Sequence, residues 1–295
     1  MNESSARPLV WVGCSATTDV QRAARHLMRD LGVQAIIGPN DSQDTLDVAQ
    51  RLTIGAGVLL VTPSAMASSI AHLLDDDLVW QLAPSAAQRA PWMRDRLERL
   101  TERVARQRGT DAPLKLGVVY RDDALGVELR TELSSLSWNG KPLADPQNLG
   151  NIVRIDAYDP ARDEQRALVR AQLEFRPDVI VLAGAAEVVT QIMAPLERAW
   201  SSDVRAPHYL LSDAAKVPEL LDLARESDGL ASRVHGTGVA PSSESEPVHE
   251  AFASAYQQRF RSLPAGSSGV APAYDASLAV ALAAAGLAEE HPNGA

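Results

Sequence analysis

A chain of 295 residues is longer than one hydrophobic core usually supports, so two domains or lobes are expected. The formal net charge of −10 argues against nucleic acid as a partner, because a negatively charged surface repels the phosphate backbone. Aromatic residues make up 4% of the chain and leave few rings to stack on bases. With one cysteine, Cys14, the chain cannot form an intramolecular disulfide.

Short apolar runs bounded by turn residues alternate with longer amphipathic stretches along the whole chain. The predicted strands are 8–13, 33–38, 57–62, 116–120, 152–156, 178–183, 207–211 and 234–239. The predicted helices are 18–31, 43–54, 65–73, 87–107, 125–136, 162–175, 187–200, 216–225, 247–261 and 273–288. Pro91 lies inside one of them, so that helix is expected to start later or to be kinked. This alternation is typical of βα units, and it predicts an α/β fold with parallel sheets.

The segment LVWVGCS around Cys14 resembles a lipoprotein cleavage site. The apolar run before it is about half the ~7 to 15 residues of a signal peptide, so Cys14 is interpreted as a strand residue. No apolar run in the sequence reaches the ~18 to 20 residues that a membrane span requires.

Two connections are predicted to divide the chain into lobes. RQRGTDAPLKLG (106–117) contains charge, Gly and Pro and opens a new set of strands, and GVAPSSESEPVHE (238–250) leads to a final pair of helices. We therefore expect lobe 1 over 1–110, lobe 2 over 111–241, and a return to lobe 1 over 242–295. The crossing segments are expected to act as a hinge.

Patterns of enzyme chemistry are mostly missing from the sequence. It contains no nucleophile elbow, Walker loop or His-Glu-x-x-His motif, and its six histidines lack metal-ligand spacing. The run Asp75–Asp77 could attract a cation, but it lacks the alternating ligands and glycine of a calcium loop, so a solvated turn is favoured. No cofactor or metal is predicted.

Small polar residues follow several predicted strands and precede helices. In IIGPNDS, Ser42 is placed either to cap the next helix or to bind a ligand at its amino terminus. Thr62-Pro63-Ser64 repeats the arrangement after strand 57–62. Arg121-Asp122-Asp123 follows strand 116–120, as a turn or as part of a pocket. Carboxyl ends of parallel strands are where α/β proteins usually bind ligands.

The order of these motifs resembles a known family. RHLMRDLGVQAIIGPNDS, GVLLVTPSA, VWQLAPS, LKLGVVYRDDALGVEL, FRPDVIVLAGAAEVVTQI, PHYLLSD and APAYDASLAVA occur in the order found in type I periplasmic binding proteins of the branched-chain amino acid receptor-like group. The resemblance extends from about residue 9 nearly to the end. It implies two Rossmann-like lobes joined by crossing strands, which close on a small solute and deliver it to an ABC importer.

The resemblance also assigns roles to individual residues. Ser42 matches the serine that holds the solute carboxylate, Ser64 and Ala65 match the small residues whose backbone faces the ligand, and Asp213 matches the acidic residue that binds the ammonium group. The candidate ligand-binding residues are Asn40, Asp41, Ser42, Ser64, Ala65, Arg121, Asp122, Gly184, Asp213 and Tyr274.

The chain departs from the family pattern in two ways. Met66 lies where a ligand-binding threonine is usual, and Leu125 and Ala183 lie where pocket tyrosines are usual, which argues against an ordinary branched-chain amino acid as ligand. The first strand and helix of the family would precede Pro8 and have no counterpart, so the first βα unit is expected to be missing.

The leading hypothesis is a non-enzymatic, periplasmic or cell-surface protein. It would capture an amino-acid-like or carboxylate solute in an interlobe cleft, with an ABC transporter permease as partner. The alternative is a ligand-sensing regulatory or receptor domain of the same fold that acts through a signalling module. A third and less favoured hypothesis is an α/β enzyme.

Overall fold

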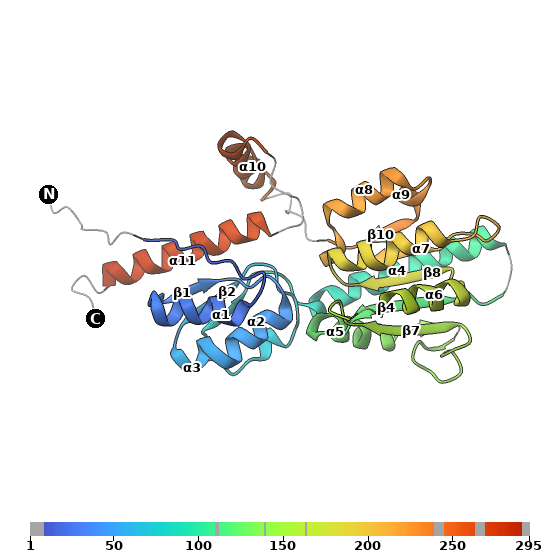
Figure 1. Ribbon diagram of the computed structural model, residues 1–295, viewed down its shortest axis with the longest axis horizontal. Helices are drawn as coiled ribbons and strands as arrows, with labels where there is room; N and C mark the ends of the chain where they lie inside the picture. Colours follow the sequence, from blue (N-terminus) through green and yellow to red (C-terminus); the bar gives the residue numbers. More distant parts are fainter. Residues whose placement is uncertain are drawn as a thin grey trace. The chain divides into compact units, whose positions relative to one another are not determined.

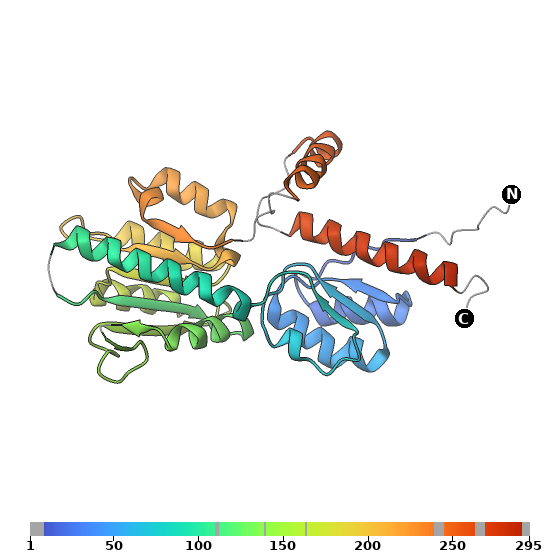
Figure 2. The same cartoon turned by 180° about the vertical axis from the view of Figure 1, so that it is seen from behind.

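The computed structural model describes residues 9–109, 112–138, 140–162, 164–238, 245–262 and 269–290, with side chains up to residue 286. The chain divides into two compact units (Figures 1 and 2). The first unit contains the chain up to Ser85 and from Glu246 onward, and the second contains Ala86–Ser245.

The first unit is built on a parallel sheet with strand order β1-β2-β3. Its elements are α1 (Val20–Arg25), η1 (His26–Asp30), β1 (Ala35–Ile37), α2 (Ser42–Val48), η2 (Ala49–Thr53), α3 (Ile54–Ala56), β2 (Leu59–Thr62), η3 (Ile70–His72), β3 (Val79–Gln81), α10 (Glu246–Phe260) and α11 (Val270–Glu290). Ile36 and Leu60 are paired across β1 and β2, and both are buried against Ala24, Val48 and Ala49 of the helices. Burial of this apolar surface holds the helices on the sheet.

Local capping explains where these helices begin and end. The Asp19 carboxylate accepts a hydrogen bond from Arg22 N at 2.8 Å and caps α1. The Asp41 carboxylate accepts from Gln43 N at 2.8 Å and caps α2. Gly57 ends α3 in the left-handed conformation (φ 65°), which glycine adopts without a steric penalty.

The last helix, α11, lies beside β1 in both views of the fold (Figures 1 and 2). Its amino-terminal end is joined to α10 by aromatic contacts, with the ring centroids of Phe252 and Tyr274 5.0 Å apart. Segments more than two hundred residues apart in the sequence are therefore neighbours in the first unit.

The second unit contains a five-stranded parallel sheet with strand order β10-β9-β8-β4-β7. Its elements are α4 (Ala86–Arg108), β4 (Leu116–Arg121), α5 (Ala124–Ser134), β5 (Ser137–Trp138), β6 (Lys141–Pro142), β7 (Val153–Tyr158), α6 (Gln165–Phe175), β8 (Val179–Ala183), η4 (Val188–Met193), α7 (Ala194–Ala199), β9 (His208–Leu211), η5 (Asp213–Ala215), α8 (Pro218–Glu226), α9 (Leu230–Arg233) and β10 (Val234–Gly236). In chain order the strands are arranged 2-1-3-4-5, a doubly wound sheet.

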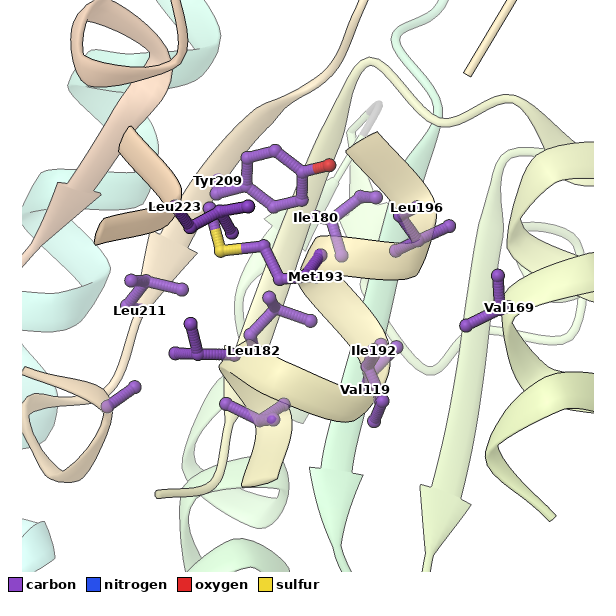
Figure 3. Packing of buried hydrophobic residues seen from close by; sticks show 14 of the residues in the cluster. Val119, Val169, Ile180, Leu182, Ile192, Met193, Leu196, Tyr209, Leu211 and Leu223 are labelled. Atoms are coloured by element: carbon purple, nitrogen blue, oxygen red, sulfur yellow. The ribbon is translucent and has the colours of Figure 1, made fainter. Parts of the chain in front are cut away.

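The core of this unit lies between the sheet and the helical segment η4–α7 (Figure 3). Ile192, Met193 and Leu196 project toward Ile180 and Tyr209 of strands β8 and β9, and all five are almost fully buried. Val179, Ile180, Val181 and Leu182 form a continuous apolar run because a central parallel strand is covered on both faces.

The predicted α/β class with parallel sheets is confirmed, and the main strands and helices lie close to their predicted bounds. Helix 87–107 corresponds to α4, which begins at Ala86 and continues through Pro91 without interruption. We expected this helix in the first lobe, but its contacts with α5 place it in the second unit. The strand predicted at 234–239 is described only as far as residue 238, and β10 ends at Gly236.

Some predicted elements are wrong. Residues 9–13 form no strand, and their side chains, including Trp11, are exposed, so an apolar run alone was not sufficient evidence for a strand. Helix 65–73 is reduced to the single turn η3, because the backbone of 65–67 bonds to side chains. Strand β3 and the β5–β6 pair were not predicted.

A chain of buried polar groups joins α4 to the sheet of the second unit. Arg96 Nη2 lies 3.1 Å from His235 Nδ1, and His235 Nε2 lies 3.3 Å from His208 Nδ1. A guanidinium only donates, so His235 Nδ1 accepts, and its protonated Nε2 donates to His208. The arrangement therefore requires both imidazoles to be neutral.

The charges around the two rings favour the same protonation state. Burial, followed by the positive charges of Arg233, Arg103 and Arg205, lowers the pKa of His208. Burial, then Arg96, His208 and Arg103, lowers the pKa of His235 from 6.5 to about 4. Glu197, the carboxylate that neutralises Arg233, is paired with that guanidinium at 2.5 Å.

We predict that acid weakens this unit through the histidine pair. Above pH 6.5, His235 is neutral in both the folded and the unfolded state. As the pH falls toward 4, His235 becomes protonated in the unfolded state but stays neutral in the folded state, so acid favours unfolding. The free energy of unfolding should fall over that interval by up to about 3 kcal/mol from this group. Denaturant titrations across this pH interval should show that the free energy of unfolding depends less on pH in His235→Gln than in the unchanged protein. His249→Gln, at an exposed site on α10, should keep the original dependence; equal dependence in both variants would contradict the assignment.

Candidate functional site

Polar groups of the first unit gather at the carboxyl ends of β1 and β2. Thr62 Oγ1 donates to the carbonyl of Pro39 at 2.6 Å and accepts from Ala65 N at 3.2 Å. Thr45 Oγ1 donates to the carbonyl of Asp41 at 2.7 Å. The loops after the two strands are therefore bonded to each other as well as to α2. We call this set, residues 39–42 and 62–67, the strand-end corner.

Ser42 is a buried structural bridge within the strand-end corner. Its hydroxyl oxygen accepts hydrogen bonds from Met66 N at 2.9 Å and Ala67 N at 3.0 Å. Its interpretation as the helix cap is wrong, because Asp41 caps α2 and Ser42 is the first helical residue. The sequence predicted that the Ser42 hydroxyl binds a ligand. In the structure this hydroxyl oxygen instead accepts from backbone amides of the loop after β2.

The other candidates of the first unit differ in accessibility. Asn40 is exposed, and its carbonyl accepts from the half-buried Ser64 hydroxyl at 3.3 Å. Ala65 is buried, and its carbonyl accepts from Gln81 Nε2 at 2.8 Å. Tyr274 is 53% exposed on α11. Of these residues, Asn40 and Ser64 present polar side chains near the end of the sheet.

Gly269 places the start of α11 against the strand-end corner. It is buried with φ 75°, and an added Cβ would lie 3.5 Å from Ser64 Oγ and 3.9 Å from Asn40 Oδ1. The positive φ favours glycine here. The chain entering α11 thus forms part of the surroundings of Asn40 and Ser64.

In the second unit the strand order reverses between β4 and β8. The loops that follow these neighbouring strands, residues 121–123 and 184–187, leave the same edge of the sheet. Such a topological switch point is the position at which doubly wound sheets bind ligands. The structure therefore gives Arg121 and Gly184, both predicted from the sequence, a common location.

A charged network crosses this switch point. The Arg121 guanidinium is paired with Asp123 and lies 3.5 Å from Glu187 Oε1. Glu187 Oε1 also accepts from the Tyr158 hydroxyl at 2.9 Å and from Ala185 N at 3.0 Å. Burial, reinforced by the negative charge of Glu187, raises the pKa of Tyr158, which stays protonated. Asp123 additionally caps α5 by accepting from Gly126 N at 2.8 Å.

The two aspartates after β4 differ in their surroundings, and Asp123, which was not among the predicted ligand-binding residues, is the one paired with Arg121. Asp122 is exposed, and its backbone N donates to the carbonyl of Tyr158 at 2.8 Å. Glu187 and Tyr158 were missed altogether. Both follow or end predicted strands, so the strand-end rule that selected Arg121 could have found them.

Gly184 is held in a space that has no room for a side chain. A Cβ at this position would overlap the Tyr158 hydroxyl. Its backbone is bonded on both sides to Ser212, whose Oγ accepts from Gly184 N at 3.3 Å and donates to the Gly184 carbonyl at 3.0 Å. The loops after β8 and β9 are fixed together by this exchange.

Asp213, the predicted ammonium-binding residue, is ion-paired with Arg89 of α4. The side chains are 16% and 13% exposed. Burial lowers the pKa of Arg89 to about 10, which leaves the guanidinium charged at neutral pH. Asp213 is therefore a carboxylate that already has a cationic partner at the end of β9.

The aspartate run Asp75–Asp77 forms a turn. Asp75 Oδ2 accepts from Val79 N at 2.6 Å, and Asp76 and Asp77 both have positive φ. Within the residues that the structure describes, no cluster of three or more His, Cys, Asp or Glu is arranged to hold a metal ion. In the same part of the chain, no helix is long and apolar enough to cross a membrane.

Both units are α/β structures with parallel main sheets and polar groups at the carboxyl ends of their strands. The periplasmic binding protein family model matches residues 15–295, and the chain belongs to that family. Members of this family bind solutes and are not enzymes. No curated protein matches the sequence significantly.

Solved structures support the fold. The chain is similar to a leucine binding protein, LivK, from Thermotoga maritima (20% identity, TM-score 0.63, 90% of this chain and 67% of that one). It is similar to a solute binding protein of an ABC transporter from Rhodopseudomonas palustris in complex with 3,4-dihydroxybenzoic acid (17%, 0.58, 87% and 63%). It is also similar to an ABC transporter substrate-binding protein from Desulfitobacterium hafniense in complex with Leu (18%, 0.59, 90% and 68%). The chain spans about two thirds of the length of these proteins.

We predict that Ser42→Ala destabilises the first unit. Removing the hydroxyl leaves the buried amides of Met66 and Ala67 without their acceptor, which should lower the free energy of unfolding by about 1 to 3 kcal/mol. Ser135→Ala, an exposed serine of the second unit, should change it by less than about 0.5 kcal/mol. Denaturant unfolding measures both; equal effects would show that the bridge carries no stability.

We also predict that Gly184→Ala disturbs the switch point by a specific clash. The new methyl group overlaps the Tyr158 hydroxyl, so stability should fall by about 1 to 3 kcal/mol. Adding Tyr158→Phe removes the overlapping oxygen and should restore part of the loss, so the two changes should be non-additive. Simple addition of the two effects in thermal or denaturant unfolding would argue against the contact.

Proposed function

We propose that this protein binds a small amino-acid-like solute through the strand-end groups of its two units. The observation that carries the proposal is the charged network at the switch point of the second unit. One cation, Arg121, faces two carboxylates, Asp123 and Glu187, so this cluster has a net negative charge and favours a positively charged group. The second unit therefore suits the ammonium end of a solute.

Asp213 is proposed as a second acidic contact for the same ammonium group. Its pairing with Arg89 uses part of its acceptor capacity, because an ionised carboxylate has about four lone-pair sites. The exposed carboxylate of Asp122 and the backbone of Gly184 are further candidates at this edge. The pairing orients the Asp213 carboxylate before a solute arrives.

The first unit is proposed to bind the carboxylate end. Asn40 presents an amide donor, and the Ser64 hydroxyl, which donates to the Asn40 carbonyl in this structure, would turn its one proton to the carboxylate when a solute binds. Ser42 and Ala65 act behind them by holding the loop backbone, and Asp41 holds the start of α2. Leucine and 3,4-dihydroxybenzoic acid, named with two of the similar structures, both carry a carboxylate. This shared feature supports a carboxylate as part of the solute.

The proposal is tested by measuring affinity for matched solutes by calorimetry. Each amino acid that binds is compared with its analogue lacking the amino group, such as leucine with 4-methylpentanoate. Glu187→Gln and Asp213→Asn should each weaken the amino acid by roughly 1.5 to 3 kcal/mol and leave the plain carboxylate nearly unaffected. Ser64→Ala should weaken both solutes, since it removes a donor to the carboxylate that they share.

A matched control separates site effects from general charge effects. Asp222→Asn removes the same charge from an exposed residue of α8 (66% exposed) and should leave both affinities unchanged. If Glu187→Gln and Asp213→Asn leave a confirmed ligand's affinity unchanged, the assignment of the ammonium site is wrong although the fold stands. Effects of Ser64→Ala on one solute only would reject the carboxylate assignment.

Import through an ABC transporter is proposed as the role of solute binding, with a periplasmic or cell-surface location. Two of the similar structures are described as ABC transporter proteins, which supports this part. Uptake of the labelled solute by cells with and without the protein tests it. Lost uptake, together with recovery of the protein outside the cytoplasm, supports import. Unchanged uptake with a lost cellular response would instead identify a sensing domain.

A further inference from the structure

A cationic cavity lies at the opposite edge of the second sheet from the switch point. It has a volume of about 640 Å³ and is lined by the chain segments that enter β4, β7 and β8. Its charged and central lining residues are Arg108, Lys115, Ile152, Arg176, Asp178 and Arg205. In a parallel sheet these are the amino ends of strands whose carboxyl ends carry Arg121 and Gly184, so the cavity is separate from the proposed solute site.

The described lining carries four cations and one carboxylate. That carboxylate, Asp178, already accepts from Arg108 Nη1 at 3.0 Å and from Lys115 N at 2.8 Å. With Asp178 and Arg108 compensating each other, Lys115, Arg176 and Arg205 leave three positive charges. Such a concentration of positive charge stands out in a chain whose net charge is −10. Like charges gathered around a cavity repel one another and favour a bound anion.

Lys115 and Arg205 are held in position by contacts with the protein and still have N–H donors that can bind a ligand. Lys115 Nζ donates to the Phe175 carbonyl at 3.2 Å and lies 5.1 Å from the centre of the Phe175 ring. Arg205 Nη2 donates to the Gln107 carbonyl at 3.2 Å. An ammonium has three donors and a guanidinium five, so each anchoring bond uses only part of the group. Because these side chains are already oriented, binding a ligand costs little additional side-chain entropy.

We propose that this cavity binds a small multivalent oxyanion, carrying two or more negative charges on phosphate or carboxylate groups. Three positive charges match such a ligand better than a zwitterionic amino acid, because the one carboxylate of the described lining is already occupied. The guanidinium groups suit paired oxygen atoms, and Lys115 supplies a point charge. This site is independent of the proposed function.

The experiment is isothermal titration of the intact chain with inorganic pyrophosphate, citrate and acetate at fixed ionic strength. Pyrophosphate or citrate should bind at least about tenfold more tightly than acetate. Binding of only one of the two multivalent ions identifies its class, phosphate or carboxylate, as the one recognised. Lys115→Gln and Arg205→Gln should each weaken that binding by about five- to tenfold, as expected for partly exposed charge-assisted contacts.

Arg225→Gln is the matched control, since it removes the same charge from an exposed arginine of α8 (75% exposed) and should leave the affinity unchanged. Arg205 is itself exposed, so its variant tests the proposal even if Lys115→Gln impairs folding. Equal weakening by Arg225→Gln, or no binding of pyrophosphate and citrate at millimolar concentration, overturns the proposal. Asp213→Asn should not change pyrophosphate affinity, which distinguishes this site from the amino-acid site.

Discussion

All strands of each main sheet run in the same direction, and this constraint determines where chemistry can occur in the molecule. Parallel pairing sends every strand's carboxyl end to one edge and every amino end to the other. In the second unit the loops carrying Arg121, Glu187 and Asp213 must therefore leave from the same edge. The cationic residues around Lys115 must lie at the opposite one. Two different kinds of charged surface follow from one topology.

Buried charges in the second unit are held by partners from other elements. Glu197 of α7 accepts from Arg233 of α9 and from the Tyr209 hydroxyl of β9 at 2.7 Å. Arg89 and Asp213 connect α4 to the end of β9. Because an unpaired buried charge is costly, each pair specifies how its two elements pack together. The acidic groups proposed to meet a solute are thus part of the framework that supports the sheet.

The first unit follows a different principle, since the loops of its strand-end corner are connected to each other by hydroxyl groups and not by ion pairs. Thr62, Thr45 and Ser42 bond to backbone atoms of the loops after β1 and β2. These bonds fix the backbone and leave Asn40 and Ser64 near the surface. The two units therefore present different polar groups at their strand ends, an amide and a hydroxyl in the first and a network of charged groups in the second.

Local patterns were sufficient to predict the α/β class, the strands β4 and β8 and the helix α4, because apolar periodicity and turn residues report the structure of neighbouring residues. They also placed Arg121 and Gly184 at strand ends. They failed for residues 9–13, whose apolar character predicted a strand although the side chains are exposed, and for β3, which is only three residues long.

The sequence by itself indicated the family, the alternation of strands and helices, and which residues follow strands β1, β2, β4, β8 and β9. Only the tertiary structure decided what the polar side chains do. Ser42 bonds to amides 24 residues away, and Asp213 is paired with an arginine more than a hundred residues earlier. Glu187 meets Tyr158 because β7 and β8 both lie beside β4. Such partners depend on how distant segments are brought together, and local sequence periodicity contains no information about that.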